Sequence, residues 1–244
     1  MIHRRKSLHS TGYLNDDGMI RRHRYFEFDV NNTQIINGQF STPSGQEIIV
    51  DWGDGSRSTY SGTNQAWSHD YGSAGDYVVR IFGSVALTKF MMSAGGADIS
   101  FDIANLPSGI FDFYCSGNNT ITGDIANLPS GLTYFRCYGN NTITGDIANL
   151  PSGIFDFYCI GSNTIAAYSG KTWVTKIDYF GLVPVSPGGL STAEVDQLLI
   201  DFDADLTWSS GDLIQLTGAN AARSSASDAA VANMVTEGAT VTTN

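Results

Sequence analysis

The chain has 244 residues, of which 42% are hydrophobic, 11% aromatic and only 15% charged. This length can form one large or two small domains with a hydrophobic core, and 27 glycines beside abundant aromatics favour a mainly β fold over a helix bundle. The net charge of −11 argues against binding to nucleic acid or to an anionic membrane.

Residues 1–24 differ from the rest of the chain in charge. They carry six basic and two acidic side chains, a net charge of +4, which leaves −15 for the remaining 220 residues. The basic residues are Arg4, Arg5, Lys6, Arg21, Arg22 and Arg24. We interpret this basic segment on an acidic body as an arm that docks to other proteins of an assembly. A disordered leader is the alternative.

The same segment lacks the features of a secretory signal. It has a basic start, but no apolar run of about 7 to 15 residues follows. No other part of the sequence approaches the roughly 18 apolar residues of a membrane span. Unless processing has removed a leader, we expect a protein that is made in a cytoplasm and does not leave by the general secretory route.

Residues 25–84 contain three strand-like runs, FEFDV, EIIVDWGDGS and YVVRIFG, separated by Asn, Gly, Ser and Pro clusters. These runs predict a small β-sandwich. The stretch resembles the PKD-like and related immunoglobulin-like modules of bacterial and phage surface proteins. The resemblance is carried by DWGDG at 51–55, SHDY at 68–71, GDY at 75–77 and VVRI at 78–81.

Two acidic residues of this stretch, Asp51 and Asp54, have two interpretations. A tight turn between strands selects Asp and Gly, with the carboxylates accepting backbone N–H groups. The resemblance implies calcium as the alternative, although no EF-hand spacing is present. We predict the turn. His69 is interpreted as a structural member of its strand, with a catalytic or metal-binding role as the alternative.

Residues 85–180 are dominated by a repeat of 22 residues that opens with DIANLPSG. The three gapless copies are 102–123, 124–145 and 146–167. A fainter copy precedes them, with Leu87, Phe90 and Met92 at its apolar positions. This period, with apolar residues at positions 1, 4 and 6 and then an Asn, resembles leucine-rich repeats and predicts a solenoid, because a single unit cannot bury its own apolar face.

Each copy carries one cysteine, at Cys115, Cys137 and Cys159. The strand of the central copy is predicted at 132–137, with the following turn closed at 140–141. Parallel stacking would place the cysteine α-carbons about 4.8 Å apart with all side chains in the core. We predict buried free thiols; a disulfide or a metal ladder is the alternative.

Residues 181–244 predict an α/β end that caps the solenoid. Two capping boxes open helices. They are Ser191-x-x-Glu194 and Ser225-x-x-Asp228. Strand-like pieces at 213–216 and 239–242 follow the two helices. This end resembles the C-terminal strand-and-helix repeats of related bacterial and phage proteins, and it would cover the last apolar face of the solenoid.

The candidate functional surface is the side of the repeat strands that faces away from the core. Alternation exposes Asp112, Tyr114 and Ser116 in the first copy, Tyr134, Arg136 and Tyr138 in the second, and Asp156, Tyr158 and Ile160 in the third. Tyrosine and arginine are enriched in recognition surfaces, and aromatic rings also stack on sugars. We predict a binding face for a glycan or a protein. Ordinary stabilisation of a sheet by cross-strand tyrosines is the alternative.

No phosphate-binding glycine loop, nucleophile elbow or metal-spaced His-Glu motif is present in the sequence, so we expect neither an enzyme nor a cofactor. The combined pattern resembles phage tail-associated and bacterial surface proteins. It implies a phage virion structural protein, a tail-fibre-like or surface-decorating adhesin in an oligomeric assembly, made in the host cytoplasm. A bacterial cell-surface adhesin is the first alternative. A glycan-active enzyme using Asp112 and Asp156, roughly 9.6 Å apart, is the second.

Overall fold

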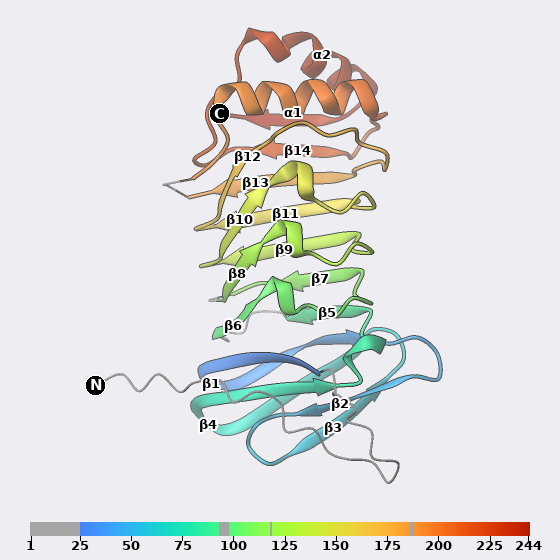
Figure 1. Ribbon diagram of the computed structural model, residues 1–244, viewed down its shortest axis with the longest axis vertical. Helices are drawn as coiled ribbons and strands as arrows, with labels where there is room; N and C mark the ends of the chain where they lie inside the picture. The colour runs from blue at the N-terminus through green and yellow to red at the C-terminus, as the bar shows by residue number, and fades with distance from the viewer. Residues whose placement is uncertain (1–24, 93–97, 118, 186–187) are drawn as a thin grey trace, which may run out of the picture.

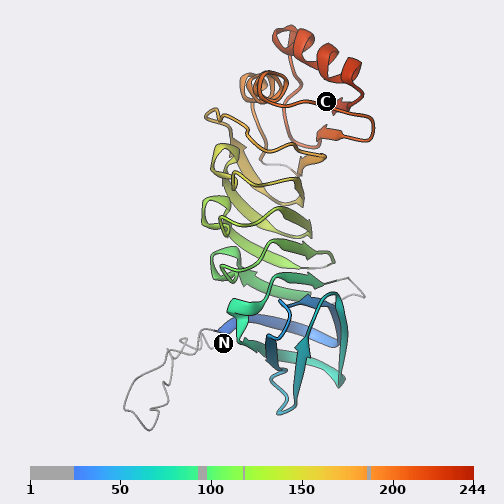
Figure 2. The ribbon, with the colours of Figure 1, turned by 90° about the vertical axis from the view of Figure 1, so that its right-hand side faces the viewer.

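The computed structural model describes residues 25–92, 98–117, 119–185 and 188–244. The predicted basic arm and its six arginine and lysine residues lie outside them. The described residues form an elongated molecule with an antiparallel sheet at one end, stacked coils in the middle and two helices at the other end (Figures 1 and 2). Neither helix is long and apolar enough to cross a membrane.

The N-terminal sheet contains four antiparallel strands in the order β3-β2-β4-β1. They are β1 (Tyr25–Ser41), β2 (Glu47–Asp51), β3 (Arg57–Ser61) and β4 (Gln65–Phe82). Alternate residues of β1, such as Phe26, Phe28 and Val30, are buried, as expected for a strand with one face on a core. All four strands belong to one hydrogen-bonded sheet, so the prediction of two facing sheets is not confirmed.

Strand β1 also starts the rest of the molecule. On the edge opposite β4 it pairs with β5 through Gly38–Ser41 and with β6 through Asp29–Asn31, both antiparallel. Register shifts on either side of Thr33 separate these two segments of the strand. Because β5 and β6 are the first strands of two parallel ladders, β1 pairs the edges that the first coil would otherwise leave open.

Two parallel ladders form the solenoid. The first ladder contains β5 (Lys89–Met92), β7 (Asp112–Cys115), β9 (Tyr134–Gly139), β11 (Asp156–Gly161), β13 (Tyr179–Pro184), β14 (Leu213–Leu216) and β15 (Thr240–Thr243). The second contains β6 (Asp98–Asp102), β8 (Thr120–Asp124), β10 (Thr142–Asp146) and β12 (Thr164–Ala167). The prediction of a mainly β chain with a solenoid is confirmed, and the coils number about four. The second strand of each coil was not predicted.

Short 3₁₀ helices lead from the second ladder back to the first. Those of the repeats are η2 (Ile103–Asn105), η3 (Ile125–Asn127) and η4 (Ile147–Asn149), while η1 (Ser84–Ala86) and η5 (Ser225–Ser227) lie near the two ends. In the central copy the Asp124 carboxylate caps η3 by accepting the N–H of Ala126 at 2.8 Å. Buried Asn141 accepts the N–H of Ile121 in the preceding coil at 3.1 Å. These bonds explain why each copy keeps the same Asp and Asn.

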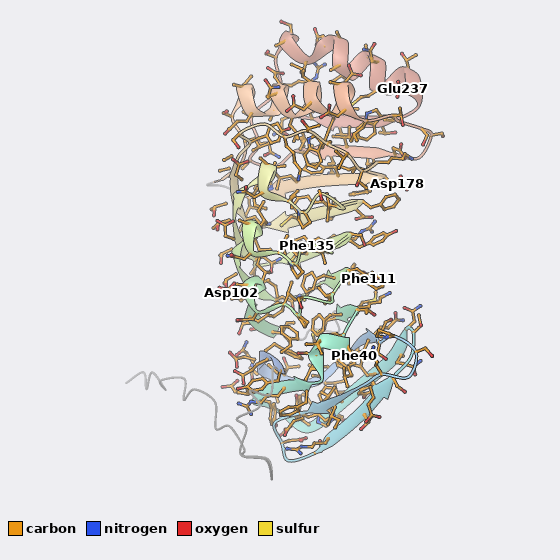
Figure 3. The ribbon with its side chains drawn as sticks, turned by 45° about the vertical axis from the view of Figure 1, so that its right-hand side comes forward. Phe40, Asp102, Phe111, Phe135, Asp178 and Glu237 are labelled. Atoms are coloured by element: carbon orange, nitrogen blue, oxygen red, sulfur yellow. The ribbon has the colours of Figure 1, made fainter. Side chains whose placement is uncertain are left out.

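The core between the ladders contains a column of phenylalanines, with Phe135 at its centre (Figure 3). The column is Phe90, Phe113, Phe135, Phe157 and Phe180, with ring centroids 6.0, 5.2, 5.7 and 5.2 Å apart. Phe90 and Met92 pair in register with Phe113 and Cys115, which confirms the faint first copy. Every coil therefore contributes one ring to a shared core, as stacking of incomplete units requires.

The three cysteines are free and fully buried in adjacent strands, as predicted. Burial raises the pKa of each thiol well above its usual range. We expect a thiol reagent to modify none of them in the native protein and all three after unfolding in guanidinium. Rapid modification under native conditions, followed by mass spectrometry, would contradict this packing.

Helices α1 (Thr192–Asp205) and α2 (Asp228–Glu237) form the C-terminal end. The first capping box is confirmed, because Ser191 accepts the N–H of Glu194, whose carboxylate accepts the N–H of Ser191 at 2.8 Å. The second is wrong: Ser224 caps the 3₁₀ turn η5, and α2 begins without a side-chain cap. The carboxylate of Asp196 holds this turn instead, by accepting from the hydroxyls of Ser224 and Ser227.

Candidate binding face on the first strand ladder

The first ladder brings the predicted face residues together in parallel rows. One row contains Asp112, Tyr134, Asp156 and Tyr179, and the next contains Tyr114, Arg136, Tyr158 and Gly181. Tyr138 and Ile160 pair in a third. We call this surface of β7, β9, β11 and β13 the outer face. Its residues point away from the phenylalanine column because side chains alternate along a strand.

Two members of the outer face are not exposed as predicted. Asp156 is only 4% exposed and Tyr158 only 8%. Neighbouring side chains of the same face cover them, and the Tyr158 ring lies over Gly181. A β-carbon at Gly181 would be 2.0 Å from Cδ2 of that ring. Strand β13 lies outside the 22-residue repeat, so the sequence pattern did not reveal that a glycine makes room for this tyrosine.

The charged groups of the outer face pair with one another. Arg136 donates to Asp156 through Nε at 2.7 Å and also through Nη2. Lys89 lies 3.2 Å from the Asp112 carboxylate. Hydrogen bonding to Asp156 raises the pKa of Arg136, so the guanidinium stays charged. The face therefore carries charges but little net charge.

Four tyrosines of the outer face pack on each other. Tyr158 lies between Tyr138 and Tyr179, with ring centroids 5.0 and 4.9 Å away, and Tyr138 is 5.8 Å from Tyr114. The guanidinium of Arg136 lies over the Tyr179 ring at 5.2 Å. Burial raises the pKa of Tyr138 and Tyr179, so these hydroxyls remain protonated donors at neutral pH. These contacts support the expectation that tyrosines stabilise the sheet, and they also fix the ring positions.

Beside these packed rings, three aromatic side chains form what we call the aromatic strip: Phe111, Tyr134 and Phe155. Phe111 is 45% exposed and Tyr134 is 40% exposed, and Phe155 is half-buried with its ring 5.5 Å from that of Tyr134. Figure 3 shows Phe111 at one edge of the molecule, with Asp102 at the opposite edge.

The backbone kinks where the chain enters each repeat strand, and this places Phe111 on the surface. The N–H groups of Phe111 and Asp112 both donate to the carbonyl of Thr88, at 3.0 and 3.2 Å. Alternation is interrupted at such a kink, so Phe111 and its neighbour Asp112 are both outside the core. Sequence reasoning missed Phe111 and Phe155 because it assumed an unbroken alternation.

The turn of the N-terminal sheet uses both predicted aspartates. Asp51 accepts the N–H of Gly53 at 3.1 Å and pairs with Arg57 at 2.9 Å. Asp54 accepts the N–H of Ser56 at 2.8 Å. These are the hydrogen bonds that the turn interpretation predicts. No three His, Cys, Asp or Glu side chains of the described ranges are grouped so as to hold a metal ion.

His69 holds this turn to the sheet, in agreement with its structural interpretation. Its Nε2 lies 2.8 Å from the Asp54 carboxylate, and its ring stacks on that of Trp52 at 4.6 Å. Burial opposes the charged form of Asp54, but hydrogen bonds from Ser56 and His69 outweigh it and lower the pKa of Asp54 to about 2.

This shift predicts an acid-sensitive contribution to stability. Because the folded pKa of Asp54 lies below its unfolded value, the carboxylate stabilises the fold above about pH 4, and this is lost as the pH falls toward 2. Solvent screening limits the contribution to about 1 kcal/mol. The difference in unfolding free energy between the original chain and Asp54→Asn should shrink by that amount between about pH 5 and pH 2.5 in urea titrations. A difference independent of pH would contradict the assignment.

Comparison of this chain with protein-family models, curated proteins and solved structures finds no match.

Proposed function

We propose that this protein is a non-enzymatic adhesin whose solenoid presents the outer face to a ligand on a cell surface. The observation that carries the proposal is the exposure of Phe111 and Tyr134 on a rigid sheet, where the core does not need them. Exposed aromatic rings beside an arginine are typical of recognition surfaces. The packed tyrosines beside them hold the face in one conformation, which reduces the entropy lost on binding.

The setting that we propose is a phage virion, in which the protein is a tail-fibre-like or surface-decorating component. Residues 1–24 would dock to other virion proteins through their basic side chains, and the acidic body would project outward. The support comes from the sequence: the PKD-like pattern of residues 25–84 followed by leucine-rich-type repeats. A bacterial cell-surface adhesin remains the second candidate.

A glycan-active enzyme is less well supported by the geometry. Such an enzyme needs one carboxyl group as an acid and another as a base or nucleophile. Asp112 pairs with Lys89, and Asp156 is nearly buried against Arg136. Both carboxylates therefore already have cationic partners.

The setting is tested by mass spectrometry and immunogold labelling of purified virions from the source culture. Labelling at tail tips or fibres supports the adhesin, and labelling over the capsid supports a decoration protein. Absence of the chain from particles would overturn the virion proposal and favour the bacterial surface protein.

The binding face is tested with Tyr134→Ala, because Tyr134 is exposed and makes no ion pair in the described structure. Loss of this ring should reduce adsorption of the purified protein to host cells by about tenfold, since exposed aromatic anchors commonly contribute 1 to 2 kcal/mol to binding. Tyr25→Ala is the matched control, because Tyr25 has similar exposure but lies in the N-terminal sheet. Equal adsorption of both variants, with unchanged circular dichroism, would exclude this face.

A further inference from the structure

The aromatic strip crosses three successive coils. Phe111 and Phe155 occupy the same position two coils apart, roughly 9.6 Å along the solenoid, and Tyr134 comes from the coil between them. The central copy has Thr133 where the other two have phenylalanine, so the repeat does not require an aromatic residue there. An exposed phenylalanine side chain is unfavourable in water, and the central copy shows that threonine at this position is compatible with the fold. An exposed Phe111 and a half-buried Phe155 on either side of the exposed Tyr134 therefore indicate a ligand with apolar surface.

The charges beside the strip constrain what that ligand can be. Asp112 is paired with Lys89, and Asp156 with Arg136. Asp178, which follows Phe155 at the same position of the next coil, is paired with Lys176 at 2.9 Å, so each of these three carboxylates has a cationic partner. Electrostatic complementarity therefore favours an uncharged ligand over an anionic or cationic one. Among the described residues, Arg136 bonds Asp156 through Nε and Nη2, which leaves Nη1 as a donor for a neutral oxygen.

The outer face is too small to bind a folded protein without further contacts. The strands from β7 to β13 span three ladder spacings, about 14 Å, and the longest have six residues, about 20 Å. Their product is about 300 Å², whereas a stable protein interface takes about 800 Å² from each partner. A second copy of this chain or a folded receptor would need contacts well beyond the strip. A short, extended ligand would not.

We propose that the aromatic strip binds a short, uncharged oligosaccharide. Sugar rings present C–H faces that pack on Phe111, Tyr134 and Phe155, and their hydroxyls accept from Arg136 and exchange hydrogen bonds with tyrosine hydroxyls. This inference rests on the proposed adhesin function and specifies the ligand class of the same face.

The test is a titration of the full chain with linear hexasaccharides, in which binding is measured by calorimetry and by saturation-transfer NMR. The neutral probes are hexamers of β-1,4-glucose, β-1,3-glucose, α-1,4-glucose, mannose and N-acetylglucosamine. The charged probes are oligogalacturonate and a heparin hexasaccharide. We expect at least one neutral probe to bind, with an affinity that changes little between about 50 and 500 mM salt.

The informative variant is Phe111→Thr with Phe155→Thr, because the central repeat already carries threonine at this position. It should keep the fold and weaken binding of the neutral probe by about tenfold or more. The matched control is Val174→Thr, which changes a side chain that is 72% exposed and outside the strip. The control should bind like the unmodified chain.

Three outcomes would overturn the inference: no binding of any neutral probe, tighter binding of a charged probe, or binding that the double substitution leaves unchanged. Failure of the saccharide inference can be distinguished from failure of the proposed binding face. If the purified protein adsorbs to cells in a Tyr134-dependent way but binds no neutral saccharide, the binding face stands and the ligand class is wrong. If adsorption is insensitive to Tyr134, the proposed face itself is wrong.

Discussion

The substitution Gly161→Ala is expected to lower the free energy of unfolding by about 3 to 5 kcal/mol. Gly161 ends strand β11 with φ +135°, a conformation that residues with a side chain rarely adopt. A β-carbon there would lie 2.0 Å from the carbonyl oxygen of Gly139 in the preceding coil. That oxygen is backbone in a ladder, so it cannot rotate away as a side chain would, and the coils would have to separate.

The control for this prediction is Gly131→Ala in the central repeat. A β-carbon at Gly131 would have no neighbour within 4 Å, and its φ lies outside the left-handed region. This variant should change stability by less than about 1 kcal/mol and can increase it, since alanine restricts the unfolded chain. Urea unfolding followed by circular dichroism measures both. Similar midpoints for the two variants would mean that the coils are less closely stacked than described.

Arg136→Ala is expected to cost about 3 kcal/mol, and Asp156→Ala less. Removal of the guanidinium leaves the Asp156 carboxylate nearly buried without its cation, and an unpaired buried charge strongly lowers the free energy of unfolding. Removal of the carboxylate leaves Arg136, whose side chain is 38% exposed and can be hydrated. Loss of Arg136 therefore destabilises the fold more than loss of Asp156, because only the first leaves an unpaired buried charge.

A double-mutant cycle measures this asymmetry. The variant Arg136→Ala with Asp156→Ala should recover much of the stability lost in Arg136→Ala, because no unpaired charge remains. Additive losses would show that the two groups do not depend on each other. Tyr134→Ala, by contrast, leaves no buried charge.

The solenoid could be predicted because its cause is local and repeated. The period of 22 residues places Phe113, Phe135 and Phe157 in one column, and the pattern alone identified them as core residues. The same holds for the buried cysteines and for the capping box at Ser191. The second strand in each TITGD segment was missed because it buries only one residue, Ile121 or Ile143, which is too short a pattern of alternation to indicate a strand.

The mainly β composition, the stacking of repeats and the outer-face residues of the three repeats follow from the sequence, since side-chain alternation and repeat period are properties of the chain. Tertiary structure alone decided which of these residues water reaches. Tyr158 is covered because Gly181, from a segment outside the repeats, leaves room for its ring to lie between Tyr138 and Tyr179. Asp156 is covered because Arg136 pairs with it. The tertiary structure also shows that β1 starts both ladders, because pairing between strands distant in sequence depends on how their edges meet in space.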